Sequence, residues 1–169
     1  MRVYVPATTV VLRQLVDEGG LTGPLTAYAV TPTLREAYAH ADQEELEYAA
    51  TMDAARASLR LVAEQPEAAP RRVVVAADVP DSAGIPHAEL GRSAVQLSVP
   101  IPVDRVASIH IDEAAAEDTV TDAMHALNAA DAGDEDAQFR VSEVEGYDLL
   151  WYATQEVTDL LNELDKRER

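Results

Sequence analysis

The sequence predicts an α/β protein: a single domain with one mixed or mostly parallel sheet of about five or six strands and helices packed on it. Two observations carry this prediction. Short β-type runs alternate along the chain with helical patterns, which is typical of a sheet whose strands are connected by helices. Residues 71–79, RRVVVAADV, form an apolar run without alternation, which favours a central strand covered on both faces.

Two neighbouring strands in the middle of the chain leave an α+β protein as the alternative. Residues 94–99 (AVQLSV) and 105–111 (RVASIHI) both favour strands, and a short segment containing Pro100 and Pro102 separates them. A gap of this length allows an antiparallel hairpin, which would make the sheet mixed.

The N-terminal residues begin with a strand, a helix and a second strand. Residues 2–6 and 26–30 favour strands because they are rich in β-branched and aromatic side chains. Between them, Thr8 or Thr9 is placed to cap a helix that ends at Gly19.

Two capping signals predict the next two helices. Thr33 and Glu36 have the spacing of a capping box at a short helix, and Asp42 and Glu45 repeat this spacing at the start of the longest helix, over 43–64. The apolar face of this long helix is wide and rich in alanine, so another element can approach it closely.

After the central strands, the pattern predicts a helix, an ambiguous segment, a strand and a final helix. Asp112 is placed to cap the helix over 113–130. Residues 137–146 fit either a helix or a strand, residues 149–153 favour a strand, and Thr154 is placed to cap the last helix.

Length and composition indicate one soluble, cytoplasmic domain over residues 1–165, followed by a charged tail over 166–169. The 169 residues are 47% hydrophobic, enough for a packed core. Cysteine is absent, which suits a reducing compartment. No apolar run reaches the roughly 18 residues of a membrane span, and no secretory signal begins the chain, so no membrane partner is expected.

The net charge of −18 is concentrated in the C-terminal third. Residues 112–169 hold 17 Asp and Glu against four Lys and Arg. This field repels phosphate backbones, so nucleic acid is not an expected partner. The charge serves solubility or provides an acidic docking surface for a basic partner.

Asp78 and Asp112 are the candidate catalytic residues, because each ends an apolar run, RRVVVAAD or VASIHID. Sites in open α/β sheets lie at the carboxyl ends of strands, where two carboxylates can act as acid and base or hold a magnesium ion. The two meet only if their strands are parallel neighbours, since antiparallel strands place them at opposite edges. In the alternative interpretation each aspartate only marks the end of a strand.

Four arginines, Arg56, Arg60, Arg71 and Arg72, are candidate anion-binding residues. Arg56 and Arg60 lie one turn apart on the long helix, and the other two begin the central strand. Arginines clustered in so acidic a chain are typical of a phosphate or carboxylate site. The alternative is pairing with carboxylates of the same chain, for example Arg60 with Glu64.

No motif predicts a cofactor or a metal centre. None of the four histidines has the spacing of a metal ligand, and neither a glycine-rich phosphate loop nor a GxSxG motif occurs. His110 and Asp112 share a strand face, which can orient an imidazole, although a packed or surface role is simpler. Core packing is also the expected role of Trp151.

Six stretches carry a resemblance to a known family: MRVYVPAT, TAYAVTPTLREAY, EELEYAATMDAARASLRL, RRVVVAADVP, VDRVASIHIDE and LLWYATQE. Together they span nearly the whole chain and resemble a family of small uncharacterised proteins from actinobacteria. The arginine-rich, lysine-poor composition agrees with such a host. That family has no assigned activity, so the resemblance implies no catalytic residue.

Two functions follow from these patterns. The first is a non-catalytic cytoplasmic protein that contacts a protein partner or a second copy of itself through its acidic C-terminal third. It predicts an exposed apolar patch beside the acidic surface. The second is a small enzyme or binding domain for an anionic metabolite, with the arginines on the anion and Asp78 or Asp112 supplying the chemistry. It predicts that these side chains converge on one cleft.

Overall fold

The computed structural model describes the whole chain, residues 1–169, and its centre is a seven-stranded sheet. The strands lie in the order β5-β6-β3-β1-β4-β8-β9, and every hydrogen-bonded pair is antiparallel. Their bounds are Arg2–Ala7 (β1), Leu25–Tyr28 (β3), Val73–Asp78 (β4), Gly84–Pro86 (β5), Ala94–Leu97 (β6), Val106–Ile111 (β8) and Leu150–Ala153 (β9). A second, two-stranded sheet pairs β2 (Gly20–Leu21) with β7 (Ile101–Pro102).

The prediction of a mixed or mostly parallel sheet is wrong, and the reason lies in the strand order. β3 and β4 do run in the same direction, since both are antiparallel to β1. However, β1 lies between them, so they are not neighbours. Helical segments also lie between β1 and β3 and between β8 and β9, and both of these pairs are antiparallel. A helix between two strands therefore fixes neither the direction of the returning strand nor its hydrogen-bonded partner. The predicted antiparallel hairpin of residues 94–99 and 105–111 is also wrong, because β3, β1 and β4 lie between β6 and β8 in the sheet.

Six α-helices accompany the sheets: α1 (Thr9–Glu18), α2 (Pro32–Ala37), α3 (Gln43–Glu64), α4 (Glu117–Asp131), α5 (Glu135–Ser142) and α6 (Val157–Glu168). Local capping explains where several of them begin. Both hydrogen bonds of the predicted box between Asp42 and Glu45 form at α3, and Thr8 caps α1. At α2 the cap is Thr31 rather than the predicted box that begins at Thr33.

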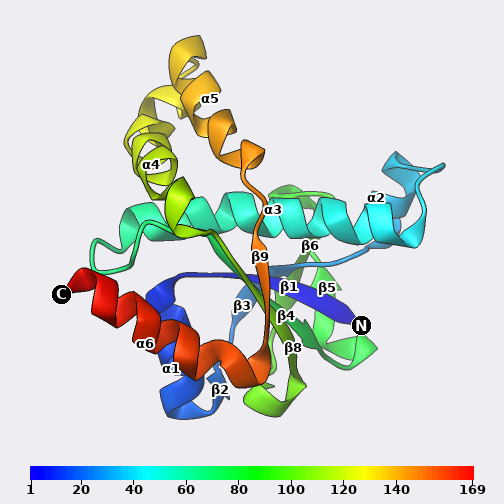
Figure 1. Cartoon of the computed structure of the whole chain (residues 1–169). Helices are drawn as coiled ribbons and strands as arrows, with labels where there is room; N and C mark the ends of the chain where they lie inside the picture. Colours follow the sequence, from blue (N-terminus) through cyan, green and yellow to red (C-terminus); the bar gives the residue numbers. More distant parts are fainter.

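Helices cover both faces of the sheet, as the apolar run of β4 predicted (Figure 1). Val73 and Val75 face a core that is shared with α1 and α6. Val74 and Ala76 face the opposite side, towards α3. The unbroken apolar run therefore indicates burial of both faces and carries no information about the direction of the neighbouring strands.

The helices α4 and α5 form a hairpin that projects from α3, away from the sheet (Figure 1). The ambiguous residues 137–146 form the end of α5 and a short 3-10 turn, Glu143–Gly146. At the base of the hairpin, Val120 and Leu127 pack with Leu59 of α3 in a small separate core. Much of the predicted acidic third of the chain lies on this projection, which we call the acidic hairpin (residues 112–148).

The last helix, α6, closes the chain. It continues to Glu168, so residues 166–168, predicted as part of a tail outside the domain, belong to it. No helix of the protein has both the length and the apolar composition needed to cross a bilayer.

Candidate functional site

Asp78 and Asp112 lie at opposite ends of the central strands. Because β8 is antiparallel to β4 and Val73 pairs with Ile111, Asp112 lies beside the first residues of β4, whereas Asp78 is its last residue. The shared catalytic or metal site required parallel neighbours, and the direction of β8 separates the two carboxylates instead.

Asp78 lies at the surface and binds Arg2 of β1. Its carboxylate accepts hydrogen bonds from Nε and Nη2 of Arg2 at 2.8 and 3.2 Å. The hydrogen bond from Arg2 lowers the pKa of Asp78 below the ordinary value of an aspartate. A carboxylate with a lowered pKa and an arginine on both oxygens is a weak general base.

Asp112 is completely buried and binds Arg72. Its Oδ2 accepts hydrogen bonds from the backbone N and the Nε of Arg72, and its Oδ1 accepts one from Nη2, each at 2.8 Å. The same Nη2 donates to the carbonyl of Tyr147 at 3.0 Å. The prediction that Asp112 caps the next helix is wrong, because Arg72 occupies its carboxylate and α4 begins at Glu117 without a side-chain cap.

The four candidate anion-binding arginines all bind carboxylates of the same chain. The pairs are Arg56 with Asp53 and Glu145, Arg60 with Asp131, Arg71 with Glu117, and Arg72 with Asp112. Arg56, Arg60 and Arg72 border one cavity of about 200 Å³ between α3 and the acidic hairpin, but each is already paired. These arginines therefore join the hairpin to the rest of the protein, and none of them has a guanidinium free of carboxylates.

His110 lies on β8, on the face of the sheet that α3 partly covers. Its Nε2 is 2.9 Å from the Oγ of Ser108, and its cross-strand neighbour is Trp151. Burial lowers the pKa of His110, and Arg2 adds to this effect. The core position predicted for Trp151 is wrong, since this side chain is 62% exposed on the edge strand β9. No group of three or more His, Asp or Glu side chains is arranged to hold a metal ion.

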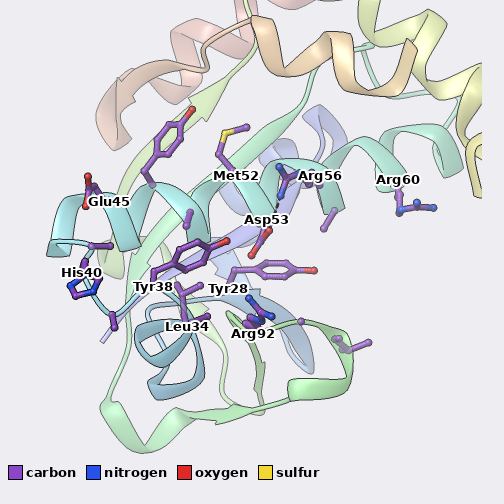
Figure 2. A pocket seen from close by; sticks show the side chains of 18 residues that line it. Tyr28, Leu34, Tyr38, His40, Glu45, Met52, Asp53, Arg56, Arg60 and Arg92 are labelled. Carbon is purple, nitrogen blue, oxygen red and sulfur yellow. Dashed lines mark hydrogen bonds and ion pairs between the residues drawn. The ribbon is translucent and has the colours of Figure 1, made fainter. Parts of the chain in front are cut away.

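The largest cavity is a groove of about 1180 Å³ that follows α3 (Figure 2). We call it the α3 groove. Its walls are Tyr28 of β3, α2 with the loop that follows it, and residues 90–92. Its floor is one face of α3, formed by residues that are alternately three positions and one position apart: Glu45, Tyr48, Ala49, Met52, Asp53, Arg56, Ala57 and Arg60. At 1.5 Å per residue, this stripe is about 22 Å long.

Large apolar side chains remain exposed along the α3 groove. Tyr38, Tyr48 and Leu90 are 52%, 62% and 51% exposed, and they come from three different segments of the chain. Exposed apolar groups that gather in this way are typical of a binding surface, whereas single ones are common on any protein.

The arginines and carboxylates that line the α3 groove are bound to other groups of the chain, with one exception. Asp53 accepts hydrogen bonds from Oγ of Ser93 at 2.6 Å and from Nη1 of Arg56 at 3.0 Å. Burial raises the pKa of Tyr28, and the nearby Asp53 adds to the shift, so the phenol stays a neutral hydrogen-bond donor. The exception is Arg92, which lies beside Tyr28 and makes no side-chain hydrogen bond or ion pair (Figure 2).

The sequence did not single out this groove. It predicts only a wide, alanine-rich apolar face on the long helix. On this helix Leu59 and Val62 are buried, whereas Tyr48 is exposed. The available signal was the width of that apolar face, because one helix buries only part of so wide a face against a sheet.

Comparison with known proteins identifies a family. Residues 1–161 match a family of unknown function, DUF6912. The chain belongs to this family. The resemblance to a family of uncharacterised proteins is thereby confirmed, and the DUF6912 match contributes no catalytic or binding residue. No curated protein and no solved structure matches the chain.

Proposed function

We propose that this protein is a non-catalytic cytoplasmic binding protein that holds a segment of another protein in the α3 groove. The observation that carries the proposal is the groove itself. It is a large surface cavity with exposed aromatic and aliphatic side chains along its length, and the candidate catalytic carboxylates lie outside it.

The dimensions of the α3 groove favour a polypeptide over a small metabolite. A length of about 22 Å accommodates roughly six or seven residues of extended chain, or about four turns of helix. Small-molecule pockets usually enclose most of the surface of their ligand. This groove is open to solvent instead, as suits a segment that lies along α3.

The alternative function, an enzyme or binding domain for an anionic metabolite, has less support. Its four arginines are neutralised by carboxylates of the chain, and Asp78 and Asp112 lie at opposite ends of β4. Three of the arginines do border one small cavity, but each is already paired there, and the carboxylate of Asp112 is held by Arg72.

The acidic C-terminal third, predicted as the contact surface, adjoins the α3 groove at one end. Arg56 and Arg60 belong to the floor of the groove, and they pair with Glu145 and Asp131 of the acidic hairpin. In this proposal the apolar groove supplies the contact, and the hairpin borders it.

A random heptapeptide phage library, selected on the full-length protein, tests this function. Selected peptides are synthesised and titrated by fluorescence anisotropy. The variant Tyr38→Ser/Leu90→Ser removes two exposed groove side chains without touching the core, and we expect it to bind at least about tenfold more weakly. The matched control, Ile85→Ser/Phe139→Ser, removes side chains that are 63% and 66% exposed outside the groove, and it should bind normally.

Two results would contradict the proposal. One is a selection that enriches no peptide. The other is equal loss of binding in the groove variant and the control variant, which would place the contact elsewhere on the protein.

A further inference from the structure

We infer that the segment held in the α3 groove carries a carboxylate, which binds the guanidinium of Arg92. This inference rests on the proposed function and adds the chemistry of the partner. The partner segment thus combines apolar side chains with an Asp, a Glu or a C-terminal carboxylate.

The charge of the α3 groove differs from that of the rest of the protein. The groove is lined by three arginines, Arg56, Arg60 and Arg92, against two carboxylates, Glu45 and Asp53. The whole chain carries 31 Asp and Glu against 13 Lys and Arg. Glu145 and Asp131 of the acidic hairpin pair with Arg56 and Arg60, so the unpaired positive charge of the groove is that of Arg92. A negatively charged segment therefore meets less repulsion beside Arg92 than at the acidic hairpin.

Arg92 is the groove arginine that is available to a partner. Arg56 and Arg60 each bind carboxylates of the chain at 3.0 Å or less. The guanidinium of Arg92 has no such partner, although the side chain lies in the groove beside Tyr28 (Figure 2). An arginine binds a carboxylate through two parallel hydrogen bonds, so the free guanidinium favours this ligand over a neutral one.

The backbone that presents Arg92 is fixed on both sides. Thr31 donates a hydrogen bond from its hydroxyl to the carbonyl of Arg92. The next residue, Ser93, is buried, binds Asp53 through its hydroxyl, and accepts a hydrogen bond from the backbone N of Ala29 at 2.8 Å. A fixed backbone reduces the ordering that binding requires, which favours a specific contact at this position.

Apolar side chains line the part of the α3 groove that holds Arg92. Tyr28 lies next to Arg92 in Figure 2, Tyr38 lines the same part of the groove, and Leu90 precedes Arg92 by two residues. A segment that places an apolar side chain on Leu90 or Tyr38 therefore brings its neighbouring residues within reach of Arg92. A carboxylate at that neighbouring position completes the contact.

The peptides selected from the heptapeptide library provide the test. Each is synthesised in two forms, one with its carboxylates and one with every carboxylate replaced by an amide. We expect the amide form to bind the wild-type protein about threefold to fivefold more weakly, as for an exposed ion pair. This preference should shrink at high salt and disappear in Arg92→Gln. The control is Arg105→Gln, an exposed arginine outside the groove without an ion pair, which should keep the preference.

Each contrary result has a distinct meaning. Equal binding of the acid and amide forms would overturn the carboxylate contact while leaving the groove as the binding site. Full retention of the preference in Arg92→Gln would overturn the role of Arg92. Enrichment of basic peptides that bind Tyr38→Ser/Leu90→Ser normally would overturn both proposals, because it would place binding on the acidic hairpin.

Discussion

The two ends of β4 carry the same kind of ion pair in opposite environments. At one end, the side chains of Arg72 and Asp112 are 2% and 0% exposed, whereas at the other end those of Arg2 and Asp78 are 43% and 54% exposed. Both pairs have a closest contact of 2.8 Å. Contact geometry therefore does not distinguish them, and burial decides how much each pair matters for stability.

The buried end also organises more of the structure. Arg72 binds Asp112, just before α4, and the carbonyl of Tyr147, just after the 3-10 turn that follows α5. It thereby holds both ends of the acidic hairpin to the sheet. The exposed end joins only β1 to β4, which the strand ladder already pairs from Arg2 to Ala7.

The largest expected change in the free energy of unfolding comes from the buried ion pair at the start of β4. Asp112→Ala leaves the charge of Arg72 buried without a partner, and we expect the free energy of unfolding to fall by about 3–5 kcal/mol in urea denaturation. The double variant Arg72→Met/Asp112→Leu removes both charges and should recover part of the loss. The recovery is incomplete because the backbone N of Arg72 and the carbonyl of Tyr147 lose their hydrogen-bond partners. A double variant as unstable as Asp112→Ala would show that the charge itself is not the cause.

A smaller loss is expected at Ser58, at the same end of β4. Its buried hydroxyl donates to the carbonyl of Ala7 at 2.7 Å and accepts from the backbone N of Val73 at 2.8 Å. Ser58→Ala leaves both backbone groups unsatisfied, which costs about 1–3 kcal/mol in the same assay. The control is Ser142→Ala, whose exposed hydroxyl bonds only to the carbonyl of Phe139. Equal losses in the two variants would argue against the role of burial.

Replacement of Asp78, at the exposed end of β4, should change the free energy of unfolding only slightly. Asp78→Ala removes a solvated ion pair and is expected to cost about 0.2–1 kcal/mol, and less at high salt. The hydrogen bond from Arg2 lowers the folded pKa of Asp78, so this contribution is present above the unfolded pKa and is lost as pH falls through the folded pKa. A loss as large as that of Asp112→Ala would remove the distinction between the two ends.

Replacement of His110, which pairs with Val74 of β4, is expected to have the smallest effect on stability at neutral pH. Burial lowers its folded pKa below the ordinary value of 6.5, with Arg2 adding to the shift. The unfolded chain therefore binds the proton first, and stability declines as pH falls from that value towards the folded pKa. Urea denaturation of His110→Gln between about pH 7.5 and 5 should show a shallower decline than the wild type. The exposed His125→Gln is the control, and equal slopes for the two variants would contradict the prediction.

Local signals account for the parts of the fold that the sequence predicted well. The long helix over 43–64 begins at a capping box whose two residues are three apart, so its start depends on neighbours in the chain. The burial of β4 on both faces follows from five consecutive apolar residues. The wide apolar face of that helix was predicted, but the α3 groove was not, because its walls come from segments around Tyr28, Tyr38 and Leu90, which only folding brings together.

By itself, the sequence determined most of the helices, most strands of the large sheet and its two-sided burial, because capping and hydrophobic periodicity act over a few residues. Only the tertiary structure decided that β1 separates β3 from β4, and that the anion bound by Arg72 is Asp112, 40 residues away. It also decided which apolar stripe of α3 stays exposed as a groove. These outcomes depend on competition among many long-range partners. The apolar pattern and the spacing of charges do not show which of those partners forms the contact.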